Sequence, residues 1–282
     1  DFTLTLPALK AVSQAFPHCA LHIVGPPPTC ALAQSEHIID GNHPDLAPLY
    51  ATPPLPERTR QLFAKTEFLL AYSHPGGIDQ QHLEKLIAGK TVFWDPHPAV
   101  GNDLHIVDHL LMPLRQLNMA MDHARPQIDL VKKDFSYVNQ LSICQPIIAH
   151  PGSGGAHKCW PLERYVQWAR ALAHDGVEVL FLCGPTERER GFAVPNDIPT
   201  LAPPNLRSLA ALLSRARLFV GNDSGPGHIA AAVNTTTLSL FGPTEPRVWA
   251  PQNAAGHILH AADGDLGKLS VATVLNATRA IL

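Results

Sequence analysis

The sequence predicts an α/β protein made of two doubly wound units. Segments that are apolar throughout, such as residues 146–150 and 177–183, alternate with segments whose apolar residues recur at helical spacing. Strands of that kind are typical of parallel sheets that helices cover on both faces. The alternation runs through both halves of the chain, and 282 residues exceed the ~100–200 that usually make one domain. We therefore expect two domains, with ligands at the carboxyl ends of their strands.

The first half contains short predicted elements. Residues 7–16 have helical spacing, and Pro7 suits the first turn of a helix. After it we expect strands at 21–24, 67–72 and 91–94, a helix at 79–88 and a longer helix at 103–119. Proline accounts for 27 of 282 residues, against an average of about 5%, and this excess favours short elements joined by stiff loops.

The second half has longer apolar runs. Its predicted elements are a strand at 146–150, a helix at 161–174, a strand at 177–183, a helix at 208–216, a strand at 218–220, a helix at 225–233 and a strand at 236–241. We predict an N-terminal domain at 1–130, a linker at 131–145 and a C-terminal domain at 146–266. A terminal helix at 267–282 is expected to pack back on the N-terminal domain.

The composition excludes several classes of protein. With 45% hydrophobic and 16% charged residues, the chain is too apolar for disorder and has too few charges for a coiled coil. A net charge of −3 argues against a nucleic-acid binder, which needs a basic excess. No apolar stretch reaches the roughly 18 residues of a membrane span, and no signal-peptide pattern opens the chain. The five cysteines form no C-x-x-C pair, so we expect reduced thiols in a cytoplasmic protein.

Residues 221–228 (GNDSGPGH) form a glycine-rich turn between a predicted strand and a predicted helix. Glycines let the backbone approach a ligand closely, and a helix N-terminus offers free N–H groups to an anion. Ser224 adds a hydroxyl, and His228 falls in the first helical turn. Asp223 repels a phosphate, so it suits sugar hydroxyls or a helix cap. A capped turn without a ligand would have the same spacing.

Residues 150–161 (HPGSGGAHKCWP) also follow a predicted strand and contain Ser153 and Lys158. The loop lacks the P-loop and dinucleotide fingerprints, because His157 stands where each requires a glycine. Two anion-binding loops at strand ends of one sheet can hold a diphosphate between them and stabilise its charge as a leaving group without a metal. The histidines occur singly, with no carboxylate–histidine cluster at ligand spacing, and residues 263–265 (DGD) are interpreted as a turn. We expect neither a metal nor a cofactor.

Together these loops resemble glycosyltransferase family 9, the ADP-heptose:lipopolysaccharide heptosyltransferases. Residues 223–232 followed by 240–246 (LFGPTEP) are similar to the family's D-[ST]-G-x-x-H…[FY]-G-P-T-x-P block. Residues 150–161 resemble its loop ending in K-x-W-P, and residues 1–9 (DFTLTLPAL) resemble the segment after its first strand. The matches follow the family's order from one end of the chain to the other.

The resemblance implies a GT-B architecture, in which two Rossmann-like domains face each other across a cleft. The donor nucleotide then binds the C-terminal domain and the acceptor the N-terminal domain. Asp1 falls where the family keeps its general base, and Lys158 falls at the donor phosphate and sugar. Asp223 falls at the donor sugar, and Glu187 near the acid that binds the ribose, with local spacing one residue longer. The diphosphate cradle corresponds to Ser153, Gly154, Ser224, Gly225, Gly227 and His228.

One departure concerns the start of the chain. The family has a strand and a glycine-bearing loop ahead of this aspartate, and we expect both to lie upstream of Asp1. Asp1 suits a base because a helix start favours its carboxylate form. The same residue would also serve as a plain helix cap.

The function that the resemblance implies is an inverting, metal-independent transfer of heptose from ADP-heptose to a lipopolysaccharide inner-core acceptor. The alternatives are a GT-B enzyme for another nucleotide sugar, including a hydrolysing epimerase, and an inactive nucleotide-binding member of the family. The expected partners are a nucleotide-sugar donor and a glycolipid or saccharide acceptor, with no nucleic acid and at most peripheral contact with the inner membrane. The oligomeric state is not visible in the sequence.

Overall fold

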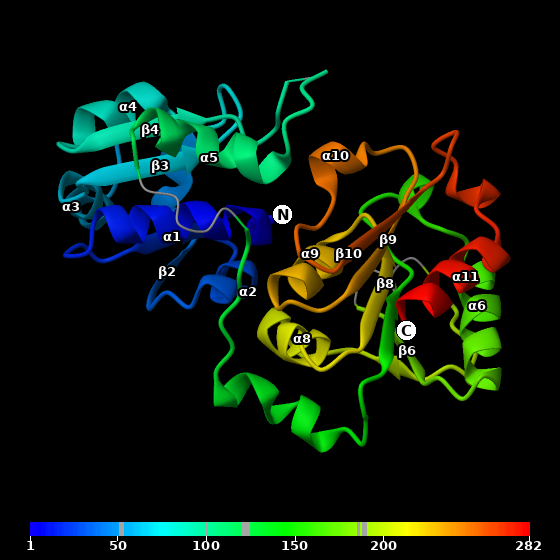
Figure 1. The fold of residues 1–282 in the computed structure, drawn as a ribbon. Helices are drawn as coiled ribbons and strands as arrows, with labels where there is room; N and C mark the ends of the chain where they lie inside the picture. The colour runs from blue at the N-terminus through cyan, green and yellow to red at the C-terminus, as the bar shows by residue number, and fades with distance from the viewer. Residues whose placement is uncertain (51–53, 100, 120–124, 185–186, 188–190) are drawn as a thin grey trace. The chain divides into compact units, whose positions relative to one another are not determined.

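A computed structural model describes residues 1–50, 54–99, 101–119, 125–184, 187 and 191–282 (Figure 1). The chain forms two compact units. The C-terminal unit comprises Arg125–Leu282 together with Asp1 and Thr3–Leu6. The N-terminal unit comprises Phe2 and Pro7–Ala124.

The C-terminal unit is built on one parallel sheet of six strands in the order β10-β9-β8-β5-β6-β7. Its strands are β5 (Ile147–His150), β6 (Val179–Leu182), β7 (Thr200–Leu201), β8 (Leu218–Asn222), β9 (Thr237–Phe241) and β10 (Gly256–His260). β5 lies between β6 and β8, and Ile147 is in register with Val179 and Leu218. Within this unit the first strand is the central β5, and the chain continues through β6 to the edge strand β7. It then crosses back to β8 on the other side of β5 and continues through β9 to β10. This is the doubly wound order, whose switch point lies between β5 and β8.

Helices cover both faces of this sheet. α8 (Leu206–Leu213) and α9 (Gly225–Ala232) lie on one face, and α6 (Leu162–His174) and α11 (Val271–Ile281) on the other (Figure 1). A short α10 (Pro246–Trp249) follows β9. α6 ends before Gly176, whose positive φ of 78° is a conformation that favours glycine. The predicted α/β class is confirmed in this unit, because apolar strands alternate with amphipathic helices.

The terminal helix differs from its prediction. Residues 266–268 form a 3-10 turn, and α11 begins only at Val271, where Ser270 accepts a hydrogen bond from the Thr273 N–H. The helix packs on α6, and the expectation that it also packs on the N-terminal domain stays a prediction. The indole of Trp168 donates to Thr278 Oγ1 at 3.0 Å. Burial of Val274 and Thr278 in this contact fixes the helix to its own unit.

Residues 131–145, expected to form a linker, contain two 3-10 segments, η4 (Lys132–Ser136) and η5 (Val138–Gln140). The buried Asp134 carboxylate accepts hydrogen bonds from the Arg207 guanidinium on α8 and from the Val131 N–H. The same guanidinium holds the pKa of Asp134 below its ordinary value, against the effect of burial. This segment therefore packs as part of the C-terminal unit.

The N-terminal unit contains two separate parallel strand pairs, β1 with β2 and β3 with β4. Its strands are β1 (His22–Gly25), β2 (His37–Asp40), β3 (Phe68–Tyr72) and β4 (Lys90–Trp94). Its helices are α1 (Leu6–Ala15), α2 (Pro27–Cys30), α3 (Glu57–Ala64), α4 (Gln80–Leu86) and α5 (Ile106–Gln116), with 3-10 segments η2 (Ala31–Ala33) and η3 (Pro44–Tyr50). The 3-10 segment η1 (Phe2–Thr5), which precedes α1, belongs mostly to the C-terminal unit. β2, α2 and α3 are additions to the predicted strands and α-helices. A proline-rich segment at 53–56 lies partly outside the described residues.

A cavity of about 380 Å³ lies between the two strand pairs. Val12 and Phe16 of α1, Val24 of β1 and Phe68 of β3 contribute to its lining. Within the described residues, β1 pairs only with β2, and β3 only with β4. A strand between β1 and β3 would complete a doubly wound order here. The strand expected upstream of Asp1 stays a prediction.

The described helices include none that is both long enough and apolar enough to cross a membrane.

Candidate nucleotide-binding site

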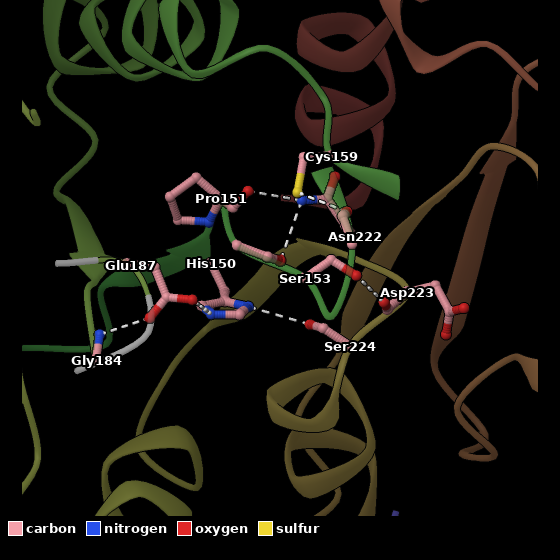
Figure 2. Close-up of polar contacts among 11 residues, drawn as sticks. His150, Pro151, Ser153, Cys159, Gly184, Glu187, Asn222, Asp223 and Ser224 are labelled. Carbon is pink, nitrogen blue, oxygen red and sulfur yellow. Dashed lines mark hydrogen bonds and ion pairs between the residues drawn. The ribbon is translucent and has the colours of Figure 1, made fainter. Parts of the chain in front are cut away.

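The carboxyl ends of β5, β6 and β8 bring three loops together at the switch point of the C-terminal sheet (Figure 2). The loop after β5 runs through residues 151–161, Gly184 and Glu187 follow β6, and residues 223–224 connect β8 to α9. In open α/β sheets this edge is where ligands bind.

His150, the last residue of β5, joins the other two loops. Its Nδ1 lies 3.0 Å from the Ser224 hydroxyl, and its Nε2 lies 3.2 Å from Oε1 of Glu187 (Figure 2). The His150 ring is buried, with 7% of the residue exposed, so these two neighbours account for both ring nitrogens. The three side chains form a chain of polar contacts across the site.

Glu187 is held as a carboxylate. The hydrogen bond from His150 lowers its pKa to about 2, and the Gly184 N–H, which donates to Oε2 at 2.8 Å, acts in the same direction against the effect of burial. The carboxylate also sits against Gly152, where a Cβ atom would lie 2.1 Å from Oε1. A side chain at position 152 would therefore displace the Glu187 carboxylate from its present contacts.

Asn222, the last residue of β8, anchors the loop after β5. Its Nδ2 donates to the carbonyl oxygens of Pro151 at 2.8 Å and Gly152 at 3.2 Å. Its Oδ1 accepts from the Trp160 N–H at 2.9 Å. The side chain is fully enclosed, with 1% of the residue exposed, and each of these bonds is made in low dielectric. Both ends of the loop are therefore fixed to β8.

Ser153 and Lys158 connect the same loop to Asp223. The Ser153 hydroxyl donates to the backbone oxygen of Asp223 at 2.8 Å, and Lys158 Nζ lies 3.6 Å from Asp223 Oδ2. Lys158 and Asp223 are each only partly exposed. A cation and a serine hydroxyl are thus held beside the start of α9, where N–H groups point toward the same space.

α9 begins at Gly225, and Ser224 is its N-cap residue with its side chain directed to His150. Gly227 and His228 are buried in the first turn, and Gly227 packs against Phe219. Asp1 belongs to this unit, and its Oδ1 accepts from the Thr3 N–H at 3.0 Å. Its Oδ2 lies 3.1 Å from the point where a Cβ on Gly225 would stand.

Residues 92–274 match the model of glycosyltransferase family 9 (heptosyltransferase). The chain belongs to glycosyltransferase family 9. Lipopolysaccharide heptosyltransferase 3 of Escherichia coli strain K12 is 34% identical over 171 residues, covering 55% of this chain and 49% of that protein. This chain therefore spans about half the length of that curated relative.

Two solved structures of the family share the fold. A glycosyl transferase family 9 protein from Veillonella parvula DSM 2008 aligns with a TM-score of 0.76 at 19% identity, covering 99% of this chain and 92% of that one. E. coli heptosyltransferase WaaC with ADP-2-deoxy-2-fluoro heptose aligns with a TM-score of 0.69 at 19% identity, covering 99% and 96%. The expected GT-B fold type is confirmed by these matches.

Within this family 9 chain, the structure brings several of the predicted site residues together. Ser153, Lys158, Asp223 and Ser224 meet at the β5 and β8 ends, and Glu187 reaches them through His150. Gly154 lies in the same loop and is exposed, whereas Gly225, Gly227 and His228 belong to α9. Their contacts with a donor stay predictions.

Two residues of this site had no predicted role: His150 and Asn222. The sequence assigns a function to His228 alone among 16 histidines, but His150 occupies the centre of the polar contacts. The signal that could have found both is a polar residue ending an apolar strand, in the runs PIIAH and LFVGN. Such residues face the ligand edge of a parallel sheet.

The family 9 chain contains a carboxylate–histidine cluster that the spacing of residues in the sequence does not reveal, and the expected absence of a metal stays a prediction. His74, Asp95 and His97 in the N-terminal unit place one ligand atom each within 4.8 Å of one another. The spacing in sequence hides this cluster, because His74 follows β3 whereas Asp95 and His97 follow β4. The DGD segment is the expected turn, since Asp265 accepts from the Gly267 N–H at 2.8 Å and Asp263 pairs with Lys268.

Proposed function

We propose that this chain carries the activity of a glycosyltransferase that moves heptose from ADP-heptose to a lipopolysaccharide inner-core acceptor. The observation that carries the proposal is the pair of loops at the β5 and β8 ends, which hold Lys158, Ser153 and Ser224 beside the N-terminus of α9. Membership of family 9 supports the heptose, as does the ADP-heptose analogue named with the solved E. coli protein.

The leaving group in this reaction is ADP, whose terminal phosphate gains negative charge as the sugar–oxygen bond breaks. Lys158 supplies a positive charge, and the first turn of α9 supplies N–H groups and the positive end of its dipole. These groups provide the electrostatic stabilisation that other transferases obtain from a divalent ion. We therefore propose a transfer that needs no metal at the diphosphate.

The proton on His150 sets what Ser224 offers to a phosphate. With a neutral ring, Nε2–H donates to the Glu187 carboxylate, so Nδ1 must accept from the Ser224 hydroxyl. To donate to a phosphate oxygen instead, the Ser224 O–H must turn away from Nδ1. The ribose role that the resemblance implies for Glu187 would use its remaining acceptor capacity.

Asp1 is the proposed general base. Its carboxylate takes the proton of the acceptor hydroxyl as the oxygen attacks the anomeric carbon. The new bond forms on the face opposite the departing ADP, so the configuration at that carbon inverts. Asp223 is assigned to a hydroxyl of the donor sugar, where its acceptor oxygens suit an O–H donor.

The acceptor is proposed to be a glycolipid or saccharide bound by the N-terminal unit. The name of the E. coli relative supports a lipopolysaccharide substrate. We propose action in the cytoplasm, with at most peripheral association with the inner membrane. The formal net charge of −3 gives little electrostatic attraction to an anionic bilayer.

The test pairs a transfer assay with a binding assay on the Asp1→Asn variant. Transfer is expected to fall by at least about 100-fold, the usual contribution of a general base, while the dissociation constant for ADP stays unchanged. Unchanged transfer would refute the base assignment. In the same calorimeter, ADP should bind more tightly than UDP or GDP. A preference for UDP or GDP would instead support a GT-B enzyme for another nucleotide sugar.

An inactive nucleotide-binding protein gives a third pattern. ADP would bind normally, and the unmodified chain would transfer no heptose to any inner-core acceptor supplied with ADP-heptose.

A further inference from the structure

A second polar cluster lies in the N-terminal unit, at the carboxyl ends of β3 and β4. These strands are parallel and in register, with Tyr72 opposite Trp94. The residues that follow them, His74 on one side and Asp95 and His97 on the other, therefore emerge at the same sheet edge. A proline directly follows each of the three, which restricts the backbone that carries these side chains.

The three side chains are already close to one another. His74 Nδ1 lies 3.1 Å from Asp95 Oδ1, and the His74 and His97 rings stack with centroids 4.9 Å apart and planes 10° from parallel. Asp95 Oδ1 also accepts from the His97 N–H at 2.9 Å, which closes the turn between them. All three ligand atoms lie within 4.8 Å of one another.

The protein interior holds the Asp95 backbone in place. His109 on α5 is buried, and its Nε2 lies 2.8 Å from the carbonyl oxygen of Asp95. Because Asp95 offers a carbonyl oxygen, Nε2 is the donor in this contact. The backbone of Asp95 is therefore held by α5, whereas the side chains of His74 and His97 are exposed to solvent.

We propose that His74, Asp95 and His97 bind one divalent transition-metal ion. Two imidazoles and one carboxylate form a set that suits Zn²⁺, Fe²⁺ or Ni²⁺ rather than Ca²⁺ or Mg²⁺. Ligands at about 2.0–2.1 Å from a tetrahedral ion stand about 3.3 Å apart, and the His74–Asp95 distance already matches this value. Rotation of the exposed His97 ring completes the set.

Three protein ligands leave a coordination position for water or for an oxygen of a small ligand. A cavity of about 310 Å³ shares Asp95 with the cluster and is also lined by Ser73, Gln80 and Trp94. This cavity gives the open position a place for an oxygen-bearing molecule. The ion belongs to the N-terminal unit, whereas the loops proposed to bind ADP belong to the C-terminal unit.

The experiment measures Zn²⁺ binding to the full chain without an affinity tag, after treatment with EDTA and dialysis. Titration with zinc chloride is expected to show one equivalent bound. In Asp95→Asn and His97→Gln, the affinity should fall by at least about 100-fold, because loss of a direct ligand costs more than loss of an outer-shell partner. Binding that is unchanged in both variants would overturn the proposal.

Two control variants distinguish the cluster from other histidines. His43 forms a pair with Asp45 at 3.7 Å, and His37 stacks on His22 with centroids 4.6 Å apart. His43→Gln and His37→Gln should each retain the bound equivalent. A loss in either control that equals the loss in His97→Gln would place the ion elsewhere and refute the site.

A measurement on the unmodified protein avoids dependence on the folding of the variants. X-ray absorption of the Zn²⁺-loaded chain is expected to show two imidazole ligands with oxygen completing the shell. One imidazole, or a sulfur ligand, would contradict the assignment. EDTA should leave the affinity for ADP unchanged, so failure of the metal site and failure of the proposed nucleotide site give different results.

Discussion

The two units of this chain contain similar strands and helices, but the strands differ in how far they are buried. Every residue of β8 and β9 in the C-terminal unit is buried, whereas every residue of β3 in the N-terminal unit is only partly buried. The six-stranded sheet gives each central strand a partner on both sides, and the strand pairs do not. In keeping with this difference, His150 and Asn222 are buried among their partners, whereas the side chains of His74 and His97 are exposed. A continuous sheet positions its ligand edge before the ligand arrives.

The largest expected effect comes from removing one core side chain from each unit and comparing the two losses of stability. Trp168→Ala deletes a fully buried indole and its hydrogen bond to Thr278, and should lower the free energy of unfolding by about 4 kcal/mol. Phe93→Ala in the partly buried β4 should cost only about 2 kcal/mol. Urea denaturation followed by circular dichroism measures both. Equal losses would contradict the difference in packing.

The next test concerns the buried carboxylate of the C-terminal unit. Folding depresses the pKa of Glu187 to about 2, so its stabilisation is complete above the unfolded pKa of about 4.3 and is lost as the pH falls toward 2. Glu187→Gln should therefore lower the free energy of unfolding at pH 7 by about 1–3 kcal/mol, where the upper end corresponds to the whole pKa shift and solvent screening reduces it. The deficit should shrink steadily below pH 4. Exposed Glu178→Gln is the control, and an equal deficit there would refute the assigned role.

A smaller effect is expected in amide hydrogen exchange, which measures the protection of strands in both units within the same unmodified protein. Amides of β8 and β9 should exchange at least about 100-fold more slowly than those of β3 and β4, because buried ladders open only with large-scale unfolding. Mass spectrometry of peptides from each pair of strands gives the ratio. Equal protection would mean that the N-terminal strand pairs are as stable as the continuous sheet.

The difference between buried and exposed strands also determined which strands could be predicted from the sequence. The strands β5, β8 and β9 were predicted to within two residues, because their apolar runs need no partner to be recognised. β2 (HIID) and β10 (GHILH) were missed, since histidines and an exposed edge break both the apolar run and the alternation. The helix at 267–282 was found, but not its partner α6, because residue spacing gives the buried face and not what covers it.

The loops that form the site were predicted from the sequence, but the contacts that join one loop to another were not. Ser153, Lys158, Asp223 and Ser224 stand in glycine-rich segments whose composition indicates an anion site. The role of His150 depends on residues 37 and 74 positions away, which only the order of strands brings together. The cluster of His74, Asp95 and His97 was missed for the same reason, since two strands must pair before it exists.

We propose that the loops at the β5 and β8 ends bind the diphosphate of ADP. Calorimetry with ADP and with adenosine on Lys158→Ala tests it most directly, with Lys268→Ala as the matched control. Loss of one charged contact should weaken ADP binding by about 10-fold and leave adenosine binding unchanged, whereas Lys268→Ala should change neither. Unchanged ADP affinity in Lys158→Ala, or an equal loss for adenosine, would contradict the claim.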